Sequence, residues 1–211
     1  MESFLDDIRV IYLRTPRTGS TTLTQGFIED HQYHALAVDG RLWQGNSLYE
    51  NQLAQGKDSW DTINNVIGLD RWRDCYTFTS VRNPFDRMVS LYKTAWLGKV
   101  ATFREFCHKV ATDDYPNEQD MIAKWHSRVL TDHILDSEGR CIVDDIIRFE
   151  HFEEDFGKII IKLGLSSYTL PHHNLTSHHT QHTFNKLSDT VGVPRQQLPE
   201  SDDSGKLHYT D

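Results

Sequence analysis

The most constraining feature of this sequence is a short apolar run that ends in a loop rich in Thr and Ser. Residues 9–15 are mainly β-branched and apolar, and Pro16 and Gly19 follow closely. A run of this kind, bounded by turn residues, is typical of a buried strand. The apolar residues after the loop keep a helical spacing, so we expect a helix to begin near Ser20 or Thr21.

The same order of strand, loop and helix recurs further along the chain. Residues 75–81 indicate a second strand, after which Asn83 offers an N-cap and Pro84 a first helical position. Residues 141–149 indicate a third strand, again followed by helically spaced apolar residues. We expect the helix after the second strand to bury one apolar face, made of Phe85, Met88, Val89, Tyr92 and Trp96.

Strands that alternate with helices predict the α/β class, with a mainly parallel sheet covered on both faces. We expect a single P-loop-like domain whose central parallel sheet has about four or five strands and is flanked by helices. Residues 58–67 indicate one of these helices, capped by Asp58 or Ser59 and ended by Gly68. Residues 30–57 keep no sustained period, so we expect loops and short pieces there, and recognition of an acceptor.

Length and composition favour one domain in a reducing compartment. A chain of 211 residues suits a single domain, which we place at residues 1–193, with a mobile tail at residues 194–211 that is rich in Gln, Pro, Ser and Asp. No stretch approaches the ~18–20 apolar residues of a membrane span, and the first residues lack the pattern of a secretory signal. Three sparse cysteines are typical of reduced thiols. We therefore expect a cytoplasmic protein with no membrane partner.

The acidic balance of the chain restricts its ligands. A net charge of −9 argues against a nucleic-acid partner. A site for an anion must then be local, and residues 15–22, Thr-Pro-Arg-Thr-Gly-Ser-Thr-Thr, provide one at the start of a helix, where unpaired N–H groups and the helix dipole favour negative charge. Gly19 would let the backbone approach the ligand, and Arg17 would add a permanent charge. The alternative is a helix cap rich in Ser and Thr that binds no ligand.

The loop does not match that of a nucleotide kinase. That pattern is Gly-x-x-x-x-Gly-Lys-Ser/Thr, with lysine directly after the second glycine. Here Ser20 follows Gly19, position 14 is arginine, and the basic residue of the loop precedes the glycine. The kinase pattern therefore fails.

A second group of anion-binding residues follows the second strand. Arg82 lies at the carboxyl end of that strand, where open α/β sheets bind ligands. Arg87 and Ser90 are three residues apart on the next helix, and we expect them on the side away from its core face. An arginine fork beside a hydroxyl suits a phosphate monoester. The alternative is an arginine paired with a carboxylate such as Asp86, next to a solvated serine.

Together the two segments resemble the sulfotransferases. That family carries a Pro-Lys/Arg-x-Gly-x-Thr loop after its first strand and an arginine followed eight residues later by a serine. The resemblance covers most of residues 8–184 in the family's order. Within the family, the chain is similar to the branch of bacterial and carbohydrate O-sulfotransferases, in residues 144–150, 154–156, 163–165 and 170–174.

The resemblance implies a reaction and a set of site residues. The donor would be 3'-phosphoadenosine-5'-phosphosulfate (PAPS), the acceptor a hydroxyl of a sugar or small metabolite, and the leaving group 3',5'-ADP, with no metal required. Arg17 would be catalytic and would stabilise the leaving phosphate. The residues expected to contact the nucleotide are Arg17, Thr18, Gly19, Ser20, Thr21, Thr22, Arg82, Ser90 and Ser177.

The base that takes the acceptor proton has two main candidates. Relatives often carry a histidine just before the helix at residues 58–67, where this chain has Lys57. A lysine can act as base when its pKa is lowered to ~7–8, and His34 titrates in a suitable range. We expect Lys57 or His34 to be catalytic, with Asp39, Glu50 and Asp58 as further candidates.

The sequence leaves two other hypotheses open. If neither base serves, the acceptor would be an amine, or the protein would bind PAPS or 3',5'-ADP without transferase activity. A small-molecule kinase is the third hypothesis, and the loop disfavours it.

Five histidines between residues 172 and 182 have partly the spacing of metal ligands. No cysteine or carboxylate completes a set, so we expect no metal.

Overall fold

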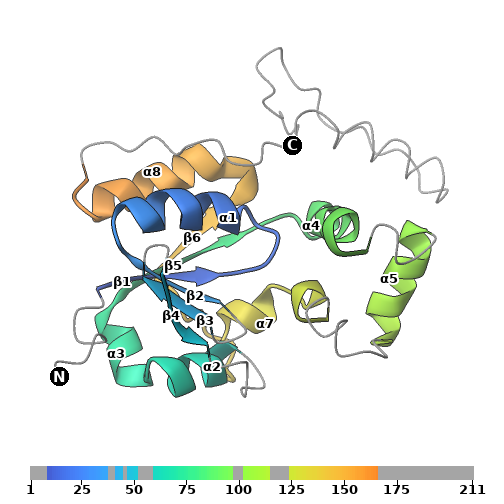
Figure 1. Cartoon of the computed structure of the whole chain (residues 1–211), viewed down its shortest axis with the longest axis horizontal. Helices are drawn as coiled ribbons and strands as arrows, with labels where there is room; N and C mark the ends of the chain where they lie inside the picture. Colours follow the sequence, from blue (N-terminus) through green and yellow to red (C-terminus); the bar gives the residue numbers. More distant parts are fainter. Residues whose placement is uncertain are drawn as a thin grey trace, which may run out of the picture.

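A six-stranded sheet forms the centre of the computed structural model (Figure 1). The structure describes residues 9–37, 41–44, 47–51, 59–96, 102–114 and 124–165. The order across the sheet is β4-β3-β2-β1-β5-β6. The strands are β1 Val10–Arg14, β2 His34–Ala37, β3 Arg41–Gln44, β4 Ser47–Asn51, β5 Tyr76–Val81 and β6 Asp145–Arg148.

The four strands β2, β1, β5 and β6 pair in parallel, which confirms the expected α/β class. Two further strands, β3 and β4, extend the sheet in antiparallel fashion. Residues 30–57, for which we expected loops and short pieces, contain three short strands that belong to the main sheet. They are four or five residues long, and β2 is buried on both faces, so no alternation of polar and apolar residues marks it.

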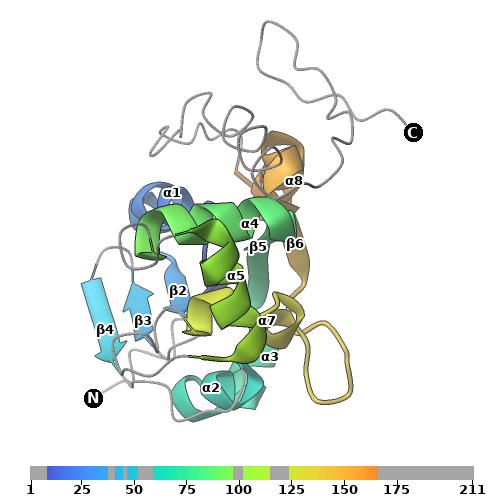
Figure 2. The ribbon, with the colours of Figure 1, turned by 90° about the vertical axis from the view of Figure 1, so that its right-hand side faces the viewer.

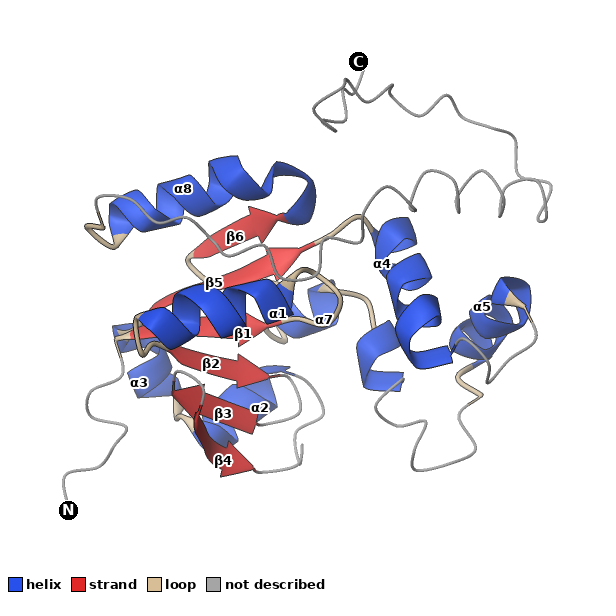
Figure 3. Ribbon diagram, turned by 45° about the horizontal axis from the view of Figure 1, so that its top comes forward, coloured by secondary structure: helices blue, strands red, loops and turns tan. Residues whose placement is uncertain are grey.

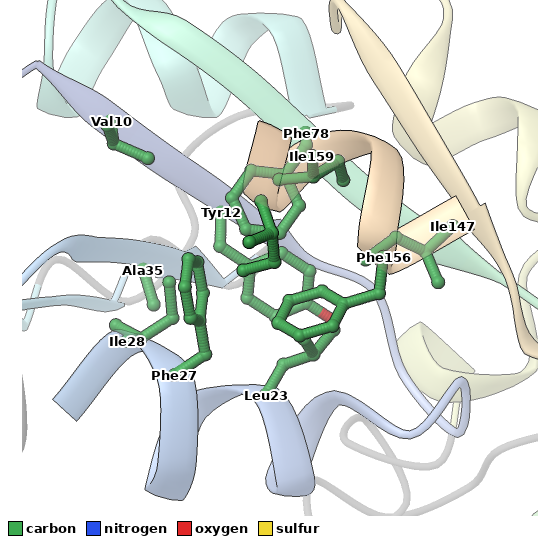
Figure 4. Packing of buried hydrophobic residues seen from close by; sticks show 11 residues of the cluster. Val10, Tyr12, Leu23, Phe27, Ile28, Ala35, Phe78, Ile147, Phe156 and Ile159 are labelled. Atoms are coloured by element: carbon green, nitrogen blue, oxygen red, sulfur yellow. The ribbon is translucent and has the colours of Figure 1, made fainter. Parts of the chain in front are cut away.

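One face of the sheet is covered by the helix after β1 and by the last described helix. The first begins as α1 Ser20–Leu23, as expected, and continues as η2 Thr24–Ile28, while the second is α8 Phe152–Lys162. Figure 4 shows Leu23 and Phe27 pointing from this helix toward Tyr12 on β1. Phe27 meets Phe156 of α8 edge to face, with ring centroids 5.0 Å apart. The two helices and the sheet thus share one apolar core.

The opposite face carries α2 Ser59–Val66, α3 Leu69–Asp74 and α7 Thr131–Ile134 (Figure 2). Their apolar residues pack against Ile11, Leu13 and Leu36 of the sheet. Trp72 of α3 is almost fully buried here, and its indole N–H donates to the Ile142 carbonyl oxygen at 2.8 Å. The two central strands β1 and β5 are consequently buried between helical layers.

The helix after β5 lies beyond the carboxyl end of that strand (Figure 3). It comprises α4 Pro84–Leu91 and η3 Tyr92–Trp96, and it packs on α5 Phe103–Thr112 around Leu91 and Phe106. The cap at its start is confirmed, because the Asn83 side chain accepts a hydrogen bond from the Phe85 N–H at 2.9 Å. The expected core face was partly wrong, since Phe85 is 73% exposed. This end of α4 lies past the carboxyl end of β5 (Figure 3), where none of the described strands covers it.

The third predicted strand is shorter than expected because an aspartate interrupts its start. The Asp144 carboxylate accepts hydrogen bonds from the N–H of Thr77 at 2.7 Å and from the Thr77 hydroxyl at 2.9 Å. Regular pairing of β6 with β5 begins only at Asp145, and Cys141 pairs instead with Leu135 in an isolated bridge.

A charged contact fastens the end of β6 to α8. The Asp155 carboxylate is buried and accepts three hydrogen bonds from Arg148, at 2.7 Å from Nε, 2.8 Å from Nη2 and 3.0 Å from the backbone N–H. Between β6 and α8 lies the single turn η4 Phe149–His151. The contact therefore fixes the turn at the carboxyl edge of the sheet. Within the described ranges, no helix has the length and apolar character needed to cross a membrane.

Replacing Asp155 by asparagine is expected to loosen this turn and to lower the melting temperature by roughly 5 °C at pH 7. Hydrogen bonds from Arg148 hold the pKa of Asp155 well below its usual range. The ionised Asp155 side chain therefore contributes its full stabilisation of the folded protein above the ordinary Asp pKa of about 3.9. This contribution is lost as the pH falls below that value. Glu153→Gln is the matched control, because Glu153 is an exposed carboxylate on the same turn of α8. Equal shifts for both variants in a thermal melt at pH 7 would contradict the assignment.

Candidate functional site

Three loops meet at the carboxyl edge of the sheet. They follow β1, β5 and β6, the three adjacent strands in the sheet order. The Arg82 guanidinium lies over the Phe149 ring at 4.2 Å from its centroid, and the Asn83 N–H donates to Glu150 at 2.7 Å. A side-chain carbon at Gly19 would lie 3.2 Å from the same Phe149 ring. This is the place where open α/β sheets bind ligands.

The loop after β1 has an unusual backbone. Arg17 has a φ of 66° and Gly19 a φ of 82°, both in the left-handed region. Gly19 precedes the first turn of α1, and in the described part of the chain no side chain caps this helix end. N–H groups of such a turn are donors for an anion. Ser20 is nearly buried, and Thr21 and Thr22 are half-buried at this turn.

The Thr18 side chain does not face this edge. It is fully buried, and its hydroxyl donates to the Thr15 carbonyl oxygen at 2.9 Å and lies 2.7 Å from the Ser80 hydroxyl. The expected contact of Thr18 with the nucleotide was therefore wrong for its side chain, whose hydroxyl bonds inside the protein. Sequence spacing alone does not show which side chains of a tight loop turn inward.

Arg17 and Ser90 meet across the edge. The Arg17 Nε and Nη2 atoms donate to the Ser90 hydroxyl oxygen at 3.2 Å and 2.9 Å. The pKa of Arg17 is lowered first by burial and then by the positive charge of Arg82. The structure thus brings together two arginines and a hydroxyl from separate segments. Two guanidinium groups that repel each other favour an anion between them.

Arg82 is held by an aromatic ring and by nearby carboxylates. Burial lowers the pKa of Arg82, while the charges of Asp86 and Glu150 raise it. Within the described residues its buried Nε atom has no hydrogen-bond partner. A buried donor of this kind is costly unless a ligand or water accepts from it. Asp86 and Glu150 offset part of the positive charge at this position.

Arg87 was expected on the surface beside Ser90, and the structure corrects this. Its side chain is 2% exposed, and its guanidinium donates to the carbonyl oxygens of Pro16 at 3.1 Å, His126 at 2.7 Å and Arg128 at 2.6 Å. Burial lowers its pKa to about 10, so it stays charged at neutral pH. Arg87 faces inward because α4 lies against the loop after β1 at this point. It supports the loop and does not reach the edge.

His34 is far from the edge. It is the first residue of β2 and pairs with Ile11, whereas the strand reaches the edge at Ala37, which pairs with Arg14. Three residues along a strand correspond to about 10 Å. The side chain is buried, and burial lowers its pKa to about 4. The structure therefore does not bring His34 together with the other site residues.

Several expected site residues lie outside the described residues. They include Lys57 and Ser177, so their roles stay predictions. The same holds for Asp39, Asp58, the histidines of residues 172–182 and the tail at residues 194–211, while for Glu50 only the backbone of β4 is described. Among the residues that are described, no three His, Cys, Asp or Glu side chains form a group that could hold a metal ion.

Sequence reasoning missed two residues of the edge, Phe149 and Glu150. Both stand at the end of the third predicted strand, next to Arg82 and Asn83 of the neighbouring strand. Since ligands bind at the carboxyl ends of parallel strands, their position after a strand was the available signal. The order of the strands, which sequence did not reveal, decides that they adjoin Arg82.

A model of the sulfotransferase family matches residues 4–203, which is nearly the whole chain. Searches among curated proteins and among solved structures found no match.

Buried His34 and His133 predict a loss of stability on mild acidification. Burial lowers the pKa of His34 to about 4, and burial with the charges of Arg87 and Arg128 lowers that of His133 to about 3. The unfolded chain binds protons from about pH 6.5 downward. The unfolding free energy should therefore fall as the pH drops from 6.5 toward 4, by up to about 1.4 kcal/mol per pH unit for each histidine.

Urea unfolding at pH 7, 6 and 5 measures this slope. His34→Gln should reduce it, whereas His108→Gln, at an exposed position of α5, should leave it unchanged. A slope that His34→Gln does not alter would show that His34 is protonated in the folded protein.

Proposed function

This chain belongs to the sulfotransferase family and is a sulfuryl-transferring enzyme, and on that premise we propose that its donor is PAPS and its acceptor a hydroxyl. The resemblance to bacterial and carbohydrate O-sulfotransferases favours a sugar or small metabolite as the acceptor. The second product would be 3',5'-ADP.

The meeting of Arg17, Ser90 and Arg82 at one sheet edge is the observation that carries this proposal. PAPS has anionic groups at both ends, a phosphosulfate at the 5' position and a phosphate at the 3' position. The loop at residues 15–22 would bind the first through N–H groups and Arg17, and Arg82 with Ser90 would bind the second. The chain has a net charge of −9, so two arginines side by side at this edge support a local anion site.

Ser90 can serve both groups at once. Its hydroxyl oxygen accepts from Arg17, which leaves its single hydrogen available to donate to the 3'-phosphate. Arg82 would offer the Nε atom that has no partner in the described residues. Both ends of the nucleotide would then be joined through the contact between Arg17 and Ser90.

In the proposed reaction the acceptor oxygen attacks sulfur in line with the leaving group. The new bond forms between that oxygen and sulfur, and the bond from sulfur to the bridging phosphate oxygen breaks, with both electrons staying on 3',5'-ADP. Arg17 would stabilise the charge that develops on the leaving phosphate. A guanidinium stays protonated, so it acts by its charge and its hydrogen bonds. The acceptor proton needs a base, for which Lys57 is the remaining main candidate.

Nucleotide selectivity tests the donor. Saturating 3',5'-ADP at about 100 times its dissociation constant should add ~2.7 kcal/mol and raise the melting temperature by roughly 5–10 °C. At the same concentration 5'-AMP, which lacks the 3'-phosphate, should stabilise the protein much less, and ATP with Mg²⁺ should have little effect. Stabilisation by ATP with Mg²⁺ but not by 3',5'-ADP would contradict the proposal.

Substitutions at the two arginines should separate catalysis from nucleotide binding. Arg17→Ala is expected to slow 3',5'-ADP release from PAPS by roughly 10²–10³-fold, measured with a panel of sugar and phenolic acceptors. Arg82→Ala should weaken binding of 3',5'-ADP by at least about 10-fold in calorimetry and leave binding of 5'-AMP nearly unchanged. Arg73→Ala, on the exposed side of α3, is the control. Equal losses for both nucleotides in Arg82→Ala would contradict its assignment to the 3'-phosphate.

A further inference from the structure

Thr18 stands between two residues of the site, Arg17 and Gly19, yet its side chain is fully buried. It belongs to a connected set of four residues beneath the loop, which we call the hydroxyl chain: Tyr12, Thr15, Thr18 and Ser80. These residues come from β1, the loop and β5. The hydroxyl chain therefore links the loop to both central strands.

Three hydrogen bonds of the hydroxyl chain run in one direction, from Tyr12 through Ser80 and Thr18 to the Thr15 carbonyl oxygen. The Thr18 hydroxyl donates to the Thr15 carbonyl oxygen at 2.9 Å. A hydroxyl has one hydrogen, so Thr18 must accept where it lies 2.7 Å from Ser80. Its 3.0 Å contact with the Thr15 hydroxyl has no hydrogen to share, because Thr15 donates to the Ser80 carbonyl oxygen. Ser80 then donates to Thr18 and accepts from Tyr12, whose hydroxyl is 2.6 Å away. Burial raises the pKa of Tyr12 to about 12, so it keeps the proton that begins the series.

The hydrogen bond from the Thr18 side chain to the Thr15 carbonyl closes a backbone turn that contains Arg17. The bond from Thr18 to the Thr15 carbonyl spans Pro16 and Arg17, and it includes the residue whose φ is 66°. A left-handed backbone at a residue other than glycine costs free energy and persists where the surroundings enforce it. The Thr15 hydroxyl adds a bond to the Ser80 carbonyl oxygen, and Arg87 holds the Pro16 carbonyl from the other side.

The backbone at Arg17 sets where its side chain can reach. Arg17 reaches Ser90 on α4 across the edge, through two hydrogen bonds to a single oxygen. These bonds are 3.2 Å and 2.9 Å long, so a displacement of the Arg17 Cα by about an ångström would lengthen or misalign them. Geometric displacements of that size reduce rates by up to about 10²-fold in enzymes.

We propose that Thr18 is a positioning residue, which acts on sulfuryl transfer through Arg17 by fixing the loop to the hydroxyl chain. It makes no contact with the nucleotide through its side chain. The inference rests on the proposed function for its kinetic readout, whereas its effect on the loop can be measured without any ligand.

The test compares two substitutions of nearly equal size. Thr18→Val keeps the shape and removes the hydroxyl, and Thr18→Ser keeps the hydroxyl and removes the methyl group. Thr18→Val should slow 3',5'-ADP release from PAPS by roughly 10–100-fold, and Thr18→Ser should recover most of that loss. Thr112→Val is the matched control, because the Thr112 hydroxyl bonds a backbone carbonyl on the exposed face of α5.

A double-mutant cycle distinguishes positioning from a general structural effect. In an Arg17→Ala background, Thr18→Val should cost less than about 2-fold in rate, because Arg17 is no longer there to be positioned. A full 10-fold or greater loss in that background would overturn the proposal. Equal damage by Thr18→Ser and Thr18→Val would also overturn it, since the methyl group would then be what matters.

Hydrogen exchange provides the readout without ligand. Amides of residues 15–23 should exchange at least about 10-fold faster in Thr18→Val than in the wild type and in Thr18→Ser, while the helix α8 stays unchanged. Unchanged exchange in residues 15–23 would contradict the proposal even if the rate fell. If the wild type bound no 3',5'-ADP, the proposed function would fail, and the exchange result would still decide the role of Thr18.

Discussion

The parallel pairing of β1 and β5 is the constraint on which the site depends. The register sets Leu13 opposite Thr79, so both strands end at the same edge although about 65 residues separate them in the chain. Helical layers bury the two strands on both faces, which leaves them little freedom to shift. The loops that carry Arg17 and Arg82 are therefore brought together by the core, and hydrogen bonds of Thr18 to Ser80 and of Arg87 to Pro16 fix the first loop against the second strand and its helix.

Three buried or half-buried arginines have two different roles in this acidic protein: Arg87 supports a loop, and Arg17 and Arg82 provide positive charge at the edge of the sheet. The Arg87 guanidinium donates hydrogen bonds to three backbone carbonyls, one of them in the loop after β1, so it supports that loop. Arg17 and Arg82 lie at the carboxyl edge of the sheet, where the charge of Arg82 lowers the pKa of Arg17 and burial lowers that of both. A guanidinium tolerates this loss because its pKa starts so high, whereas a lysine in the same place would come closer to losing its proton. The positive charge at the edge is therefore kept ready for an anionic ligand.

The parts that sequence predicted well are those set by local chemistry. The strand before Pro16, the helix start at Ser20 and the cap at Asn83 each follow from neighbouring residues. The parts that it missed depend on tertiary packing. Strand β2 is buried on both faces and so carries no alternation, and Arg87 faces inward because α4 lies on the loop. In the same way His34 has suitable chemistry but the register places it at the wrong end of its strand.

A crystal structure with bound 3',5'-ADP tests the central claim most directly. The account predicts the 5'-phosphate against Arg17 and the N–H groups at the start of α1, and the 3'-phosphate against the Arg82 Nε and the Ser90 hydroxyl. The Phe149 ring should remain beside Arg82. A nucleotide bound at another edge of the sheet, or one whose 3'-phosphate lies away from Arg82, would contradict it.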